Sequence, residues 1–289
     1  MFCLTEDIAK FLESHGFETE FQVCDCLDVI AVKVKDSIRL ILPHPVVAKT
    51  MEEAEDLQDR FIKAKGALCN GKACVVTEDR WHSQRKMMES RLLAHLEIFD
   101  QVYARNCEIR KIDKATAAKF LEQNHSYGDA SCRYRYGMFL KRHTGHCLDW
   151  HDRLPEGTLV AVATFSNARK WQKGEKVIRS YEWTRYASLP NLRLSGGMGR
   201  MLKHFINEVQ PDDIMSYADL EWSEGTVYQT LGFVLEGIKD PVMFRIGPDW
   251  RRFPVKPVMT DDKMVSDAGN LYYRNLGSKK YRLKLTDYE

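Results

Sequence analysis

Three glycines within four residues, set between a strand-forming run and a helix-forming run, constrain this sequence more than any other feature. Gly196, Gly197 and Gly199 follow the β-forming residues 181–186 and precede the helical run 201–206. Glycines let backbone N–H groups turn toward a ligand, and the first turn of a helix adds unpaired donors and a positive dipole end. The order strand, glycines, helix therefore predicts an anion site for a phosphate or pyrophosphate.

A second strand and a short helix follow this motif. Residues 214–219 predict a strand that ends in a carboxylate, Asp219. Residues 223–231 predict a helix that begins with an N-cap serine and ends at Gly232, before a further strand at 233–236. Ligands collect at the carboxyl ends of strands in open sheets, so we expect Asp219 and the glycines at one edge.

The N-terminal region predicts an α/β domain of about 80 residues. The expected order is helix, three strands, helix, strand, over residues 5–16, 19–24, 29–34, 37–42, 51–62 and 73–76. A connector helix at 83–96 then leads to a strand at 103–110, a helix at 113–125 and two strands at 134–141 and 158–166. The fold class is therefore α/β (α+β).

Composition limits the cellular setting and the partners. The 289 residues suggest two domains, and 43 basic residues nearly cancel 41 acidic ones, so the net charge of +2 makes no case for nucleic acid. No apolar run is long enough to span a membrane, and the N-terminus lacks a signal sequence. We expect a cytoplasmic protein whose eight cysteines are reduced, and the sequence leaves its oligomeric state open.

Basic residues and aromatic residues alternate near the C-terminus, at 250–253 and 277–284. This pattern suits phosphates and unstacked bases, and it predicts nucleic-acid contacts by Arg251, Arg252, Lys279 and Lys280. A solvated edge strand and loop is the alternative.

The glycine motif and the elements after it resemble the acyl-CoA-binding half of the GNAT acyltransferase superfamily. That family usually has Arg/Gln-x-x-Gly-x-Gly/Ala in this loop; Gly197-Met198-Gly199 fits, and Leu194 stands where Arg or Gln is usual. The resemblance implies a mixed sheet with flanking helices and a donor such as acetyl-CoA or a related acyl-CoA. It assigns the pyrophosphate to Gly196, Gly197, Gly199 and Arg200, and it gives Tyr228 the role of protonating the departing thiolate.

Within that superfamily the sequence is more similar to the phage Mom DNA-modification family. The shared motifs are Glu182-x-Thr184-Arg185, Ser216-Tyr217-Ala218-Asp219 and Gly225-x-x-Tyr228-x-x-x-Gly232-Phe233, and His125-Ser126-Tyr127 is similar to its His-Tyr-Ser motif with the last two residues exchanged. The resemblance implies transfer to a DNA base amine, adenine above all, with DNA as the partner.

A second resemblance, to phage Hef-like homing-endonuclease proteins, covers more of the chain. Four motifs occur in the same order: Glu78-Asp79-Arg80-Trp81, Ser90-Arg91-Leu92, Tyr103-Ala104-Arg105-Asn106-Cys107 and Phe120-Leu121-Glu122-Gln123-Asn124-His125. It implies a restriction-endonuclease-like domain with connector helix at 1–100 and a GNAT-like, Mom-like domain with a basic tail at 101–289.

The nuclease part of this resemblance lacks a complete metal site. Those proteins hold the metal with an Asp and with a Glu on the next strand; Asp28 matches the first, but residues 38–42 contain no acid. One carboxylate does not build such a site, so we expect a degenerate nuclease domain. Glu78 and Asp79 are the nearby acids that would restore it, and a solvated helix N-terminus is their alternative.

Each candidate catalytic residue has a structural alternative. His125 ends a helix and is expected to face the acceptor, or else to interact with the helix dipole. Glu182 and Arg185 lie on opposite faces of a regular strand; a β-bulge, common at this place in GNAT folds, brings both to one side. Asp219 is expected in the site or as the cap of the turn at 221–223, and Tyr228 as an acid or as a core aromatic.

An insertion before the strand at 158–166 has ligand types that suit zinc. Its residues are His143, His146, Cys147 and His151, but the spacing matches no finger and the matched families lack it, so we interpret it as a surface loop and predict no metal.

The sequence predicts an enzyme that transfers an acyl group to a DNA base amine. Glu182 or Asp219 would act as base, His125 would orient the acceptor, and Arg185 and Trp222 would contact nucleic acid. The first alternative is a non-catalytic DNA-binding module derived from a homing endonuclease, which Leu194 favours. The second is a GNAT acetyltransferase acting on protein or small amines.

Overall fold

The structure, a computed structural model, describes residues 3–68, 73–142, 154–255 and 270–288. The chain forms two compact units. Unit 1 comprises Met1–Glu89, Ala218–Gly225 and Ile238–Lys279, and unit 2 comprises Ser90–Tyr217, Thr226–Gly237 and Lys280–Glu289. Segments from beyond residue 200 thus pack with residues up to Glu89, whereas residues 90–100, which the sequence assigned to the first domain, belong to unit 2.

Unit 1 contains a four-stranded sheet of order β1-β2-β3-β4. The first three strands are antiparallel, and β4 is parallel to β3 because helix α2 crosses between them. The elements are α1 (Leu4–Ser14), β1 (Thr19–Cys24), β2 (Leu27–Val34), β3 (Ser37–His44), α2 (Met51–Ala67) and β4 (Ala73–Thr77). The predicted order helix, three strands, helix, strand is confirmed.

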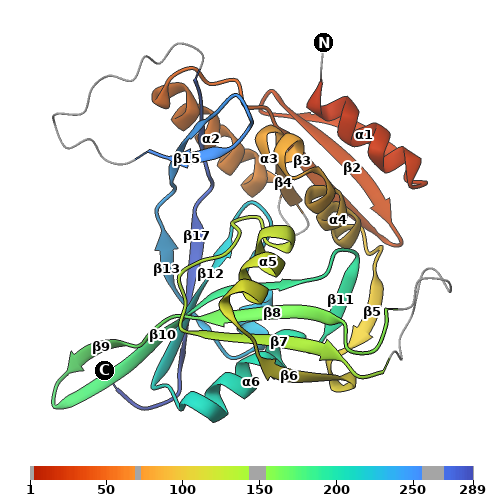
Figure 1. The fold of residues 1–289 in the computed structure, drawn as a ribbon. Coiled ribbons are helices and arrows are strands. Elements are labelled where there is room, and N and C mark those ends of the chain that lie inside the picture. The colour runs from red at the N-terminus through yellow and green to blue at the C-terminus, as the bar shows by residue number, and fades with distance from the viewer. Residues whose placement is uncertain (1–2, 69–72, 143–153, 256–269, 289) are drawn as a thin grey trace. The chain divides into compact units, whose positions relative to one another are not determined.

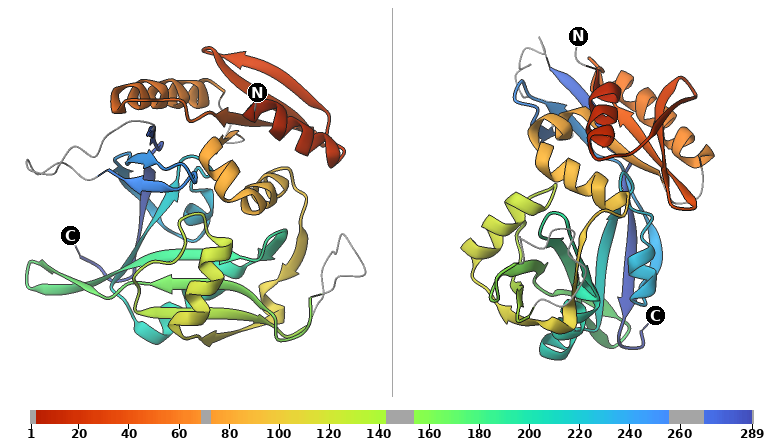
Figure 2. Two further views of the ribbon diagram at one scale, coloured as in Figure 1. Left: turned by 45° about the horizontal axis from the view of Figure 1, so that its top comes forward. Right: turned by 90° about the vertical axis from the view of Figure 1, so that its right-hand side faces the viewer.

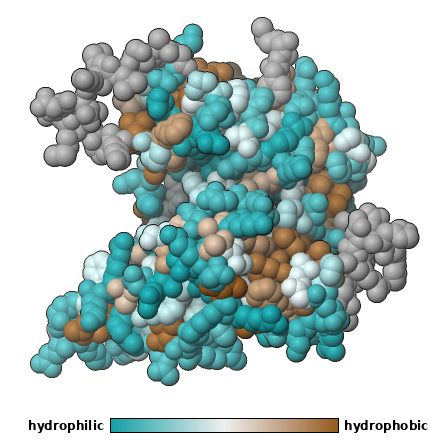
Figure 3. Space-filling model, viewed as in Figure 1, coloured by the Kyte–Doolittle hydropathy of each residue, from teal (hydrophilic) through white to brown (hydrophobic). Residues whose placement is uncertain are grey.

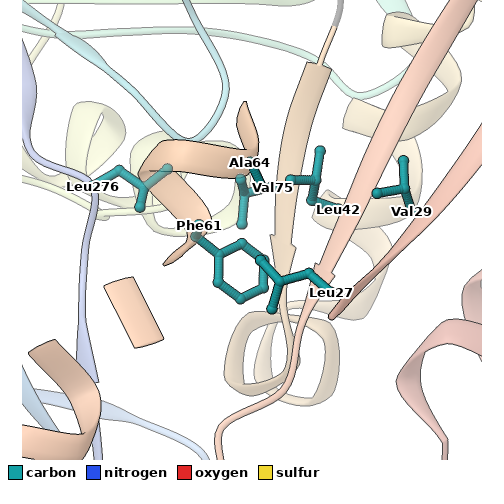
Figure 4. Packing of buried hydrophobic residues seen from close by; sticks show 7 residues of the cluster. All are labelled: Leu27, Val29, Leu42, Phe61, Ala64, Val75 and Leu276. Carbon is teal, nitrogen blue, oxygen red and sulfur yellow. The ribbon is translucent and has the colours of Figure 1, made fainter. Parts of the chain in front are cut away.

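Successive residues of β2 point to opposite faces of the sheet of unit 1, and a helix contacts each face. Phe61 of α2 packs with Leu27, Val29 and Val75 on one face (Figure 4). On the other face, the hydroxyl of Thr5 in α1 donates to Asp28 at 2.7 Å. Figure 2 shows both helices against this sheet.

The C-terminal segments of unit 1 form a three-stranded antiparallel sheet of order β15-β14-β16. The strands are β14 (Met243–Ile246), β15 (Arg252–Pro254) and β16 (Leu271–Arg274). Phe244, Ile246 and Tyr273 form a small core with Val46. This core joins residues that are about 200 positions apart in sequence.

The larger sheet is mixed, as predicted, and has the order β13-β17-β12-β10-β8-β7-β6, with β9 paired to the first half of β10 (Figure 1). β10 is antiparallel to β8 and parallel to β12. The strands are β6 (Cys107–Lys111), β7 (Tyr134–Leu140), β8 (Leu159–Phe165), β9 (Arg169–Lys173), β10 (Lys176–Ser188), β12 (Asp213–Asp219), β13 (Val234–Lys239) and β17 (Ser278–Lys284).

Helices α5 (Lys114–Asn124) and α6 (Gly197–Val209) cover opposite faces of this sheet. Phe120 of α5 packs in a cluster with Val162 of β8 and Ala187 of β10. Phe205 of α6 stacks on Phe165, three residues further along β8, with ring centroids 3.9 Å apart. Because strand residues three apart point to opposite faces, the two helices lie on different sides.

Three predicted elements differ in the structure. The strand expected at 103–110 is divided into β5 (Asp100–Tyr103), a 3₁₀ turn η1 (Ala104–Asn106) and β6, because β5 pairs with β11 (Leu192–Ser195) while β6 pairs with β7. The connector helix expected at 83–96 is α4 (Arg85–His95), and a further short helix that was not predicted, α3 (Glu78–Ser83), precedes it. Helix α7 covers only Thr226–Thr230, because the Ser223 hydroxyl accepts from Gly225 N in a preceding turn.

In the described part of the chain, no helix is long and apolar enough to cross a membrane.

Candidate functional site

The parallel strands β10 and β12 separate in the middle of the sheet of unit 2. Their pairing covers only residues 180–182 of β10 and 213–215 of β12, although both strands continue. At the next position the Ser216 hydroxyl lies 3.0 Å from the Trp183 carbonyl oxygen, to which it donates. We call this point the fork; it separates the carboxyl-terminal halves of two parallel strands, and ligands usually bind at this end of the strands in open sheets.

A β-bulge follows the fork immediately. Trp183 pairs with Phe165, but the next pair is Arg185 with Thr164, so Thr184 is the extra residue. The bulge brings Arg185 to the same face as Glu182, which is the face covered by α5. Of the two arrangements that the sequence allowed, the structure has the one that places both charged residues together.

Glu182 and Arg185 differ in their hydrogen-bond partners. The guanidinium of Arg185 donates to the Gly128 carbonyl at 3.0 Å and to the Thr184 carbonyl at 2.8 Å. Burial lowers the pKa of Arg185, and the nearby Glu182 carboxylate acts in the opposite direction. Among the described residues no hydrogen bond to the half-buried Glu182 carboxylate is found, so this carboxylate is available to accept a proton.

His125 lies at the end of α5, next to the segment that Arg185 contacts. It is the C-cap residue of the helix, and its Nδ1 accepts from the Tyr127 N–H at 3.1 Å. In neutral imidazole this contact leaves the proton on Nε2, so the ring presents an N–H donor. The carbonyl of His125 accepts from Gly128 N, whose own carbonyl binds Arg185, so the turn links His125 to the bulge.

The Tyr228 hydroxyl is held at the fork. It lies 2.9 Å from the Ser216 hydroxyl and donates to the Tyr217 carbonyl at 3.2 Å. The ring stacks on Tyr281, with centroids 5.3 Å apart. Burial raises the pKa of Tyr228, so the phenol keeps its proton at neutral pH. Sequence reasoning missed the role of Ser216, although this residue lies in one of the quoted motifs.

The glycines begin helix α6 directly, without a separate loop. Gly196 is the N-cap with φ of +77°, a conformation that favours glycine. A Cβ on Gly197 would lie 2.5 Å from the Tyr186 hydroxyl oxygen, so this glycine allows close packing. The helix has no side-chain cap and no acidic residue in its first turn, which leaves its N–H groups for an anion.

Arg200 points its guanidinium at protein carbonyls. Its Nη1 donates to the carbonyls of Ala104 and Cys107, the latter at 3.0 Å. This contact fixes the 3₁₀ turn against α6. Leu194, which stands in the place of the usual Arg or Gln, is buried in β11, where its side chain would contact a Cβ on Gly197.

Asp219 belongs to unit 1 and interacts there. Its Oδ1 accepts from Glu221 N at 3.0 Å, and its Oδ2 lies 3.8 Å from the Arg80 guanidinium. This is the turn-capping arrangement that the sequence offered as the alternative. Trp222, half-buried, follows in the same turn.

The basic residues near the C-terminus are paired with acids. Arg251 lies 3.3 Å from Asp249, and the ammonium groups of Lys279 and Lys280 lie 2.9 Å from Glu224 and 2.7 Å from Glu236. Arg252 is largely buried, with only 10% of its side chain exposed, and donates to Asp79 at 2.5 Å and to Thr77 at 2.7 Å. These contacts neutralise most of the charge that predicted nucleic-acid contacts, and they take Arg252 out of reach of solvent phosphates.

The acids considered for a nuclease metal site lie in other arrangements. Glu78 accepts from Val46 N at 2.8 Å, and Asp79 is completely buried beside Arg252. The expectation of a solvated helix N-terminus is therefore wrong for Asp79. Among the described residues no group of three or more His, Cys, Asp or Glu side chains is placed to hold a metal ion. His143, His146, Cys147 and His151 lie outside the described residues.

Asp79 is part of a larger buried network in unit 1. Arg80 donates to Glu221 at 2.8 Å, and the Tyr273 hydroxyl donates to the other Glu221 oxygen at 2.5 Å. Burial by itself raises the pKa of Glu221, but Arg80 and Arg252 hold it below its usual value. We call Asp79, Arg80, Glu221, Arg252 and Tyr273 the buried network.

No protein-family model and no curated protein matches the chain. Similar solved structures include a dodecameric spermidine N-acetyltransferase from Vibrio cholerae, with TM-score 0.36, 10% identity, and coverage of 62% of this chain and 94% of that one. A variant of the toxin AtaT, bound to acetyl-CoA and to the C-terminus of the antitoxin AtaR, has TM-score 0.30, 13% identity and coverage of 58% and 93%. An HPA2-related acetyltransferase from Corynebacterium glutamicum has TM-score 0.29, 13% identity and coverage of 84% and 96%. At these values, function has to be inferred from the site itself.

Proposed function

We propose that unit 2 transfers an acyl group from an acyl-CoA-type donor to a DNA base amine, adenine above all. The observation that carries the proposal is the fork: a half-buried carboxylate, a protonated tyrosine and a bulge are gathered where two parallel strands separate. An acyl transfer needs a base for the attacking amine and an acid for the leaving thiolate. We assign the base to Glu182, whose carboxylate has no hydrogen bond among the described residues, and the acid to Tyr228, whose raised pKa keeps its proton in place.

In the proposed reaction each of these groups has one step. As the amine nitrogen forms its bond to the acyl carbon, the Glu182 carboxylate takes the proton that the nitrogen loses. As the carbon–sulfur bond breaks, the thiolate takes the Tyr228 proton, and the tyrosine is reprotonated from solvent. The imidazole N–H of His125 orients the acceptor, and the exposed Tyr127 stacks on the base. Asp219, occupied in the turn of unit 1, is the weaker candidate for the base.

The donor's pyrophosphate is assigned to the first turn of α6. Backbone N–H groups there lack intrahelical partners, and the helix dipole favours negative charge. The donor supplies the activated thioester, and the residues of this chain bind and orient it. Gly197 and Gly199 permit close packing, because a Cβ would lie 2.5 Å from the Tyr186 hydroxyl oxygen at the first and 3.2 Å from Leu231 at the second, and the positive φ of Gly196 sets the start of the helix.

A matched pair of substitutions at Met198 tests donor binding. Met198 lies in the first turn of α6, so Met198→Glu places a carboxylate where the pyrophosphate is expected, while the helix itself tolerates an acid at this end. Met198→Gln is the neutral control of the same size. Titration of acetyl-CoA by calorimetry should show saturable binding for the natural protein and for the Gln variant, and a loss of at least tenfold for the Glu variant. No binding by the natural protein at millimolar donor excludes the proposal.

A second candidate function is a DNA-binding module without catalysis. Leu194 in the place of Arg or Gln, and the guanidinium of Arg200 occupied by Ala104 and Cys107, favour it. Such a module would bind DNA and leave nucleosides unchanged, which mass spectrometry of treated DNA would show. Modified protein or polyamine, without modified DNA, would indicate the third reading, an acetyltransferase for protein or small amines.

A further inference from the structure

A two-stranded ribbon extends from the sheet of unit 2 and was not predicted from the sequence. β9 pairs antiparallel with residues 176–180 of β10, and Gly174 with φ of +59° lies in the turn between them. Every residue of β9 is exposed. In Figure 1 the ribbon projects at the lower left, and in Figure 3 the same region is mostly hydrophilic.

Like charges face each other across this ribbon. Lys173 is directly opposite Lys176, and Lys170 is directly opposite Arg179. The two pairs lie on opposite faces, because residues 170 and 173 have different parity in the strand. Like charges directly opposite each other destabilise a strand pair, and an isolated two-stranded ribbon is already marginal in stability. A polyanion bound along the ribbon removes this cost.

The cations of β9 have not been neutralised within the protein. Among the residues that the structure describes, Arg169, Lys170 and Lys173 have no hydrogen-bonding or ion-pair partner. The two cations of β10 that face β9 do have partners: Arg179 lies 3.2 Å from Asp212, and Lys176, next to the turn, donates to the Asp287 carbonyl. Glu175, at the turn, is the one acid in the ribbon.

We infer that the β9–β10 ribbon binds the phosphate backbone of single-stranded or locally unpaired DNA. Arg169, Lys170 and Lys173 contact phosphates, and Trp171, 47% exposed, stacks on an unpaired base. In naming DNA the inference rests on the proposed function, because a base amine must leave the double helix before it can be acylated. The unpaired positive charge of the ribbon stands independently of it.

An anionic membrane fits the ribbon less well. Trp171 is opposite the buried Ile178, whereas the exposed Val177, 53% accessible, is opposite Gln172 and therefore on the other face. Membrane insertion requires one apolar face with charge on the other. Here both faces carry cations and the apolar side chains are divided between them.

The test measures binding of a fluorescein-labelled 20-nucleotide single strand by anisotropy, at several salt concentrations. Each phosphate contact contributes about 0.7 to the slope of log affinity against log salt for single strands. The double variant Lys170→Gln/Lys173→Gln should therefore reduce the slope by about 1.4, which weakens binding about 25-fold at 0.1 M salt. Trp171→Ala should weaken binding about tenfold with an unchanged slope. The matched control is Lys279→Gln/Lys280→Gln, which removes the same charge from residues that are already paired.

Two results would overturn the inference. One is equal loss of affinity in the ribbon variant and in the control, which indicates a general charge effect. The other is binding of the natural protein to phosphatidylserine vesicles and not to DNA. Acetyl-CoA binding, measured separately without DNA, should be the same in the ribbon variant and the natural protein. DNA binding without acetyl-CoA binding would therefore support DNA binding by the ribbon and exclude the acyl transfer that we propose. Acetyl-CoA binding without DNA binding would support the transferase and exclude the role of the ribbon.

Discussion

The buried network of unit 1 and the β9–β10 ribbon of unit 2 use similar residues in opposite ways. In the network every charge has a partner of opposite sign at short range: Arg252 with Asp79 and Arg80 with Glu221. In the ribbon cations face cations, and three of them lack a partner among the described residues. The number of cations in a region therefore does not identify a binding surface. A binding surface is indicated by cations that have no acidic partner within the protein. The network joins the three chain segments of unit 1, while cations of the ribbon remain available to bind an anionic ligand.

The largest expected effect comes from opening the network at Arg252. Arg252→Ala leaves the Asp79 carboxylate buried without its main partner, and breaking a buried pair in this way costs about 3–5 kcal/mol. Urea denaturation followed by circular dichroism should report this loss of stability. The neighbour Arg251, exposed and paired only with Asp249, gives the control: Arg251→Ala should change stability by less than about 0.5 kcal/mol. Similar values for both variants would mean that the network contributes no more than the surface.

Acid should weaken unit 1 by the next largest amount, through His44. Its ring stacks on Phe61 with centroids 3.9 Å apart, and its Nδ1 lies 3.0 Å from the Pro45 carbonyl oxygen. Burial lowers the pKa of His44 to about 4, although Glu221 and Asp79 act in the opposite direction. The unfolded chain takes up this proton near pH 6.5, so the stability is fully present above that pH and is lost as the pH falls toward 4. The loss is about 3 kcal/mol.

His44→Phe keeps the stacking and removes the titration. Its unfolding free energy should fall less between pH 6.5 and 4.5 than that of the natural protein. The paired acids Asp79 and Glu221 remain ionised in this window, because their pKa values lie below the usual range. Parallel curves for the two proteins would show that His44 is not the group responsible.

The sequence predicted the N-terminal elements of unit 1 well, because the spacing of apolar residues in its strands and helices is a local signal, whereas β14, β15 and β16 of the same unit were not predicted. The order of α1, β1, β2, β3, α2 and β4 needs no distant contact to be recognised. The pairing of Arg252 with Asp79 is different, since 173 positions separate the two residues and nothing local marks them as partners. The basic residues near the C-terminus were therefore predicted as a binding surface, while the ribbon was overlooked, although the cations of β9 have no partner among the described residues.

At the fork, too, the local sequence does not determine how the strands pair. Sequence motifs contained Glu182, Arg185, Ser216 and Tyr228, but they left two arrangements of the first pair open. The bulge at Thr184 gives the arrangement with both residues on one face, and at the bulge the hydroxyl of Thr184 lies 2.7 Å from that of Thr164 across the sheet. A bulge arises from the pairing of two strands, so the pattern of polar and apolar residues in one strand does not predict it.

Unit 2 offers a smaller but chemically specific effect at Tyr228. Tyr228→Phe removes the acid and keeps the stacking on Tyr281, so kcat for acyl transfer should fall about 100-fold, or about 2.7 kcal/mol, with acetyl-CoA affinity unchanged. Because burial raises the pKa of Tyr228 above the usual tyrosine value, the activity that we propose should survive a rise in pH to about 10, where an ordinary phenol is half ionised. A matching loss of donor affinity would indicate that the phenol binds the donor and does not act as an acid.

The smallest effect is expected from the lysines near the C-terminus. It tests whether paired cations bind DNA less well than the cations of the ribbon do. Lys279 and Lys280 each have a carboxylate partner, Glu224 and Glu236, at partly exposed positions where an ion pair contributes at most about 1 kcal/mol. Lys279→Gln/Lys280→Gln should lower stability by less than about 2 kcal/mol and change single-stranded DNA affinity by less than about twofold. Their ammonium groups already interact with acids, so their loss releases few counterions from DNA. An effect as large as that of the ribbon variant would show that paired cations exchange their partners for phosphates, and pairing would then no longer distinguish the two regions.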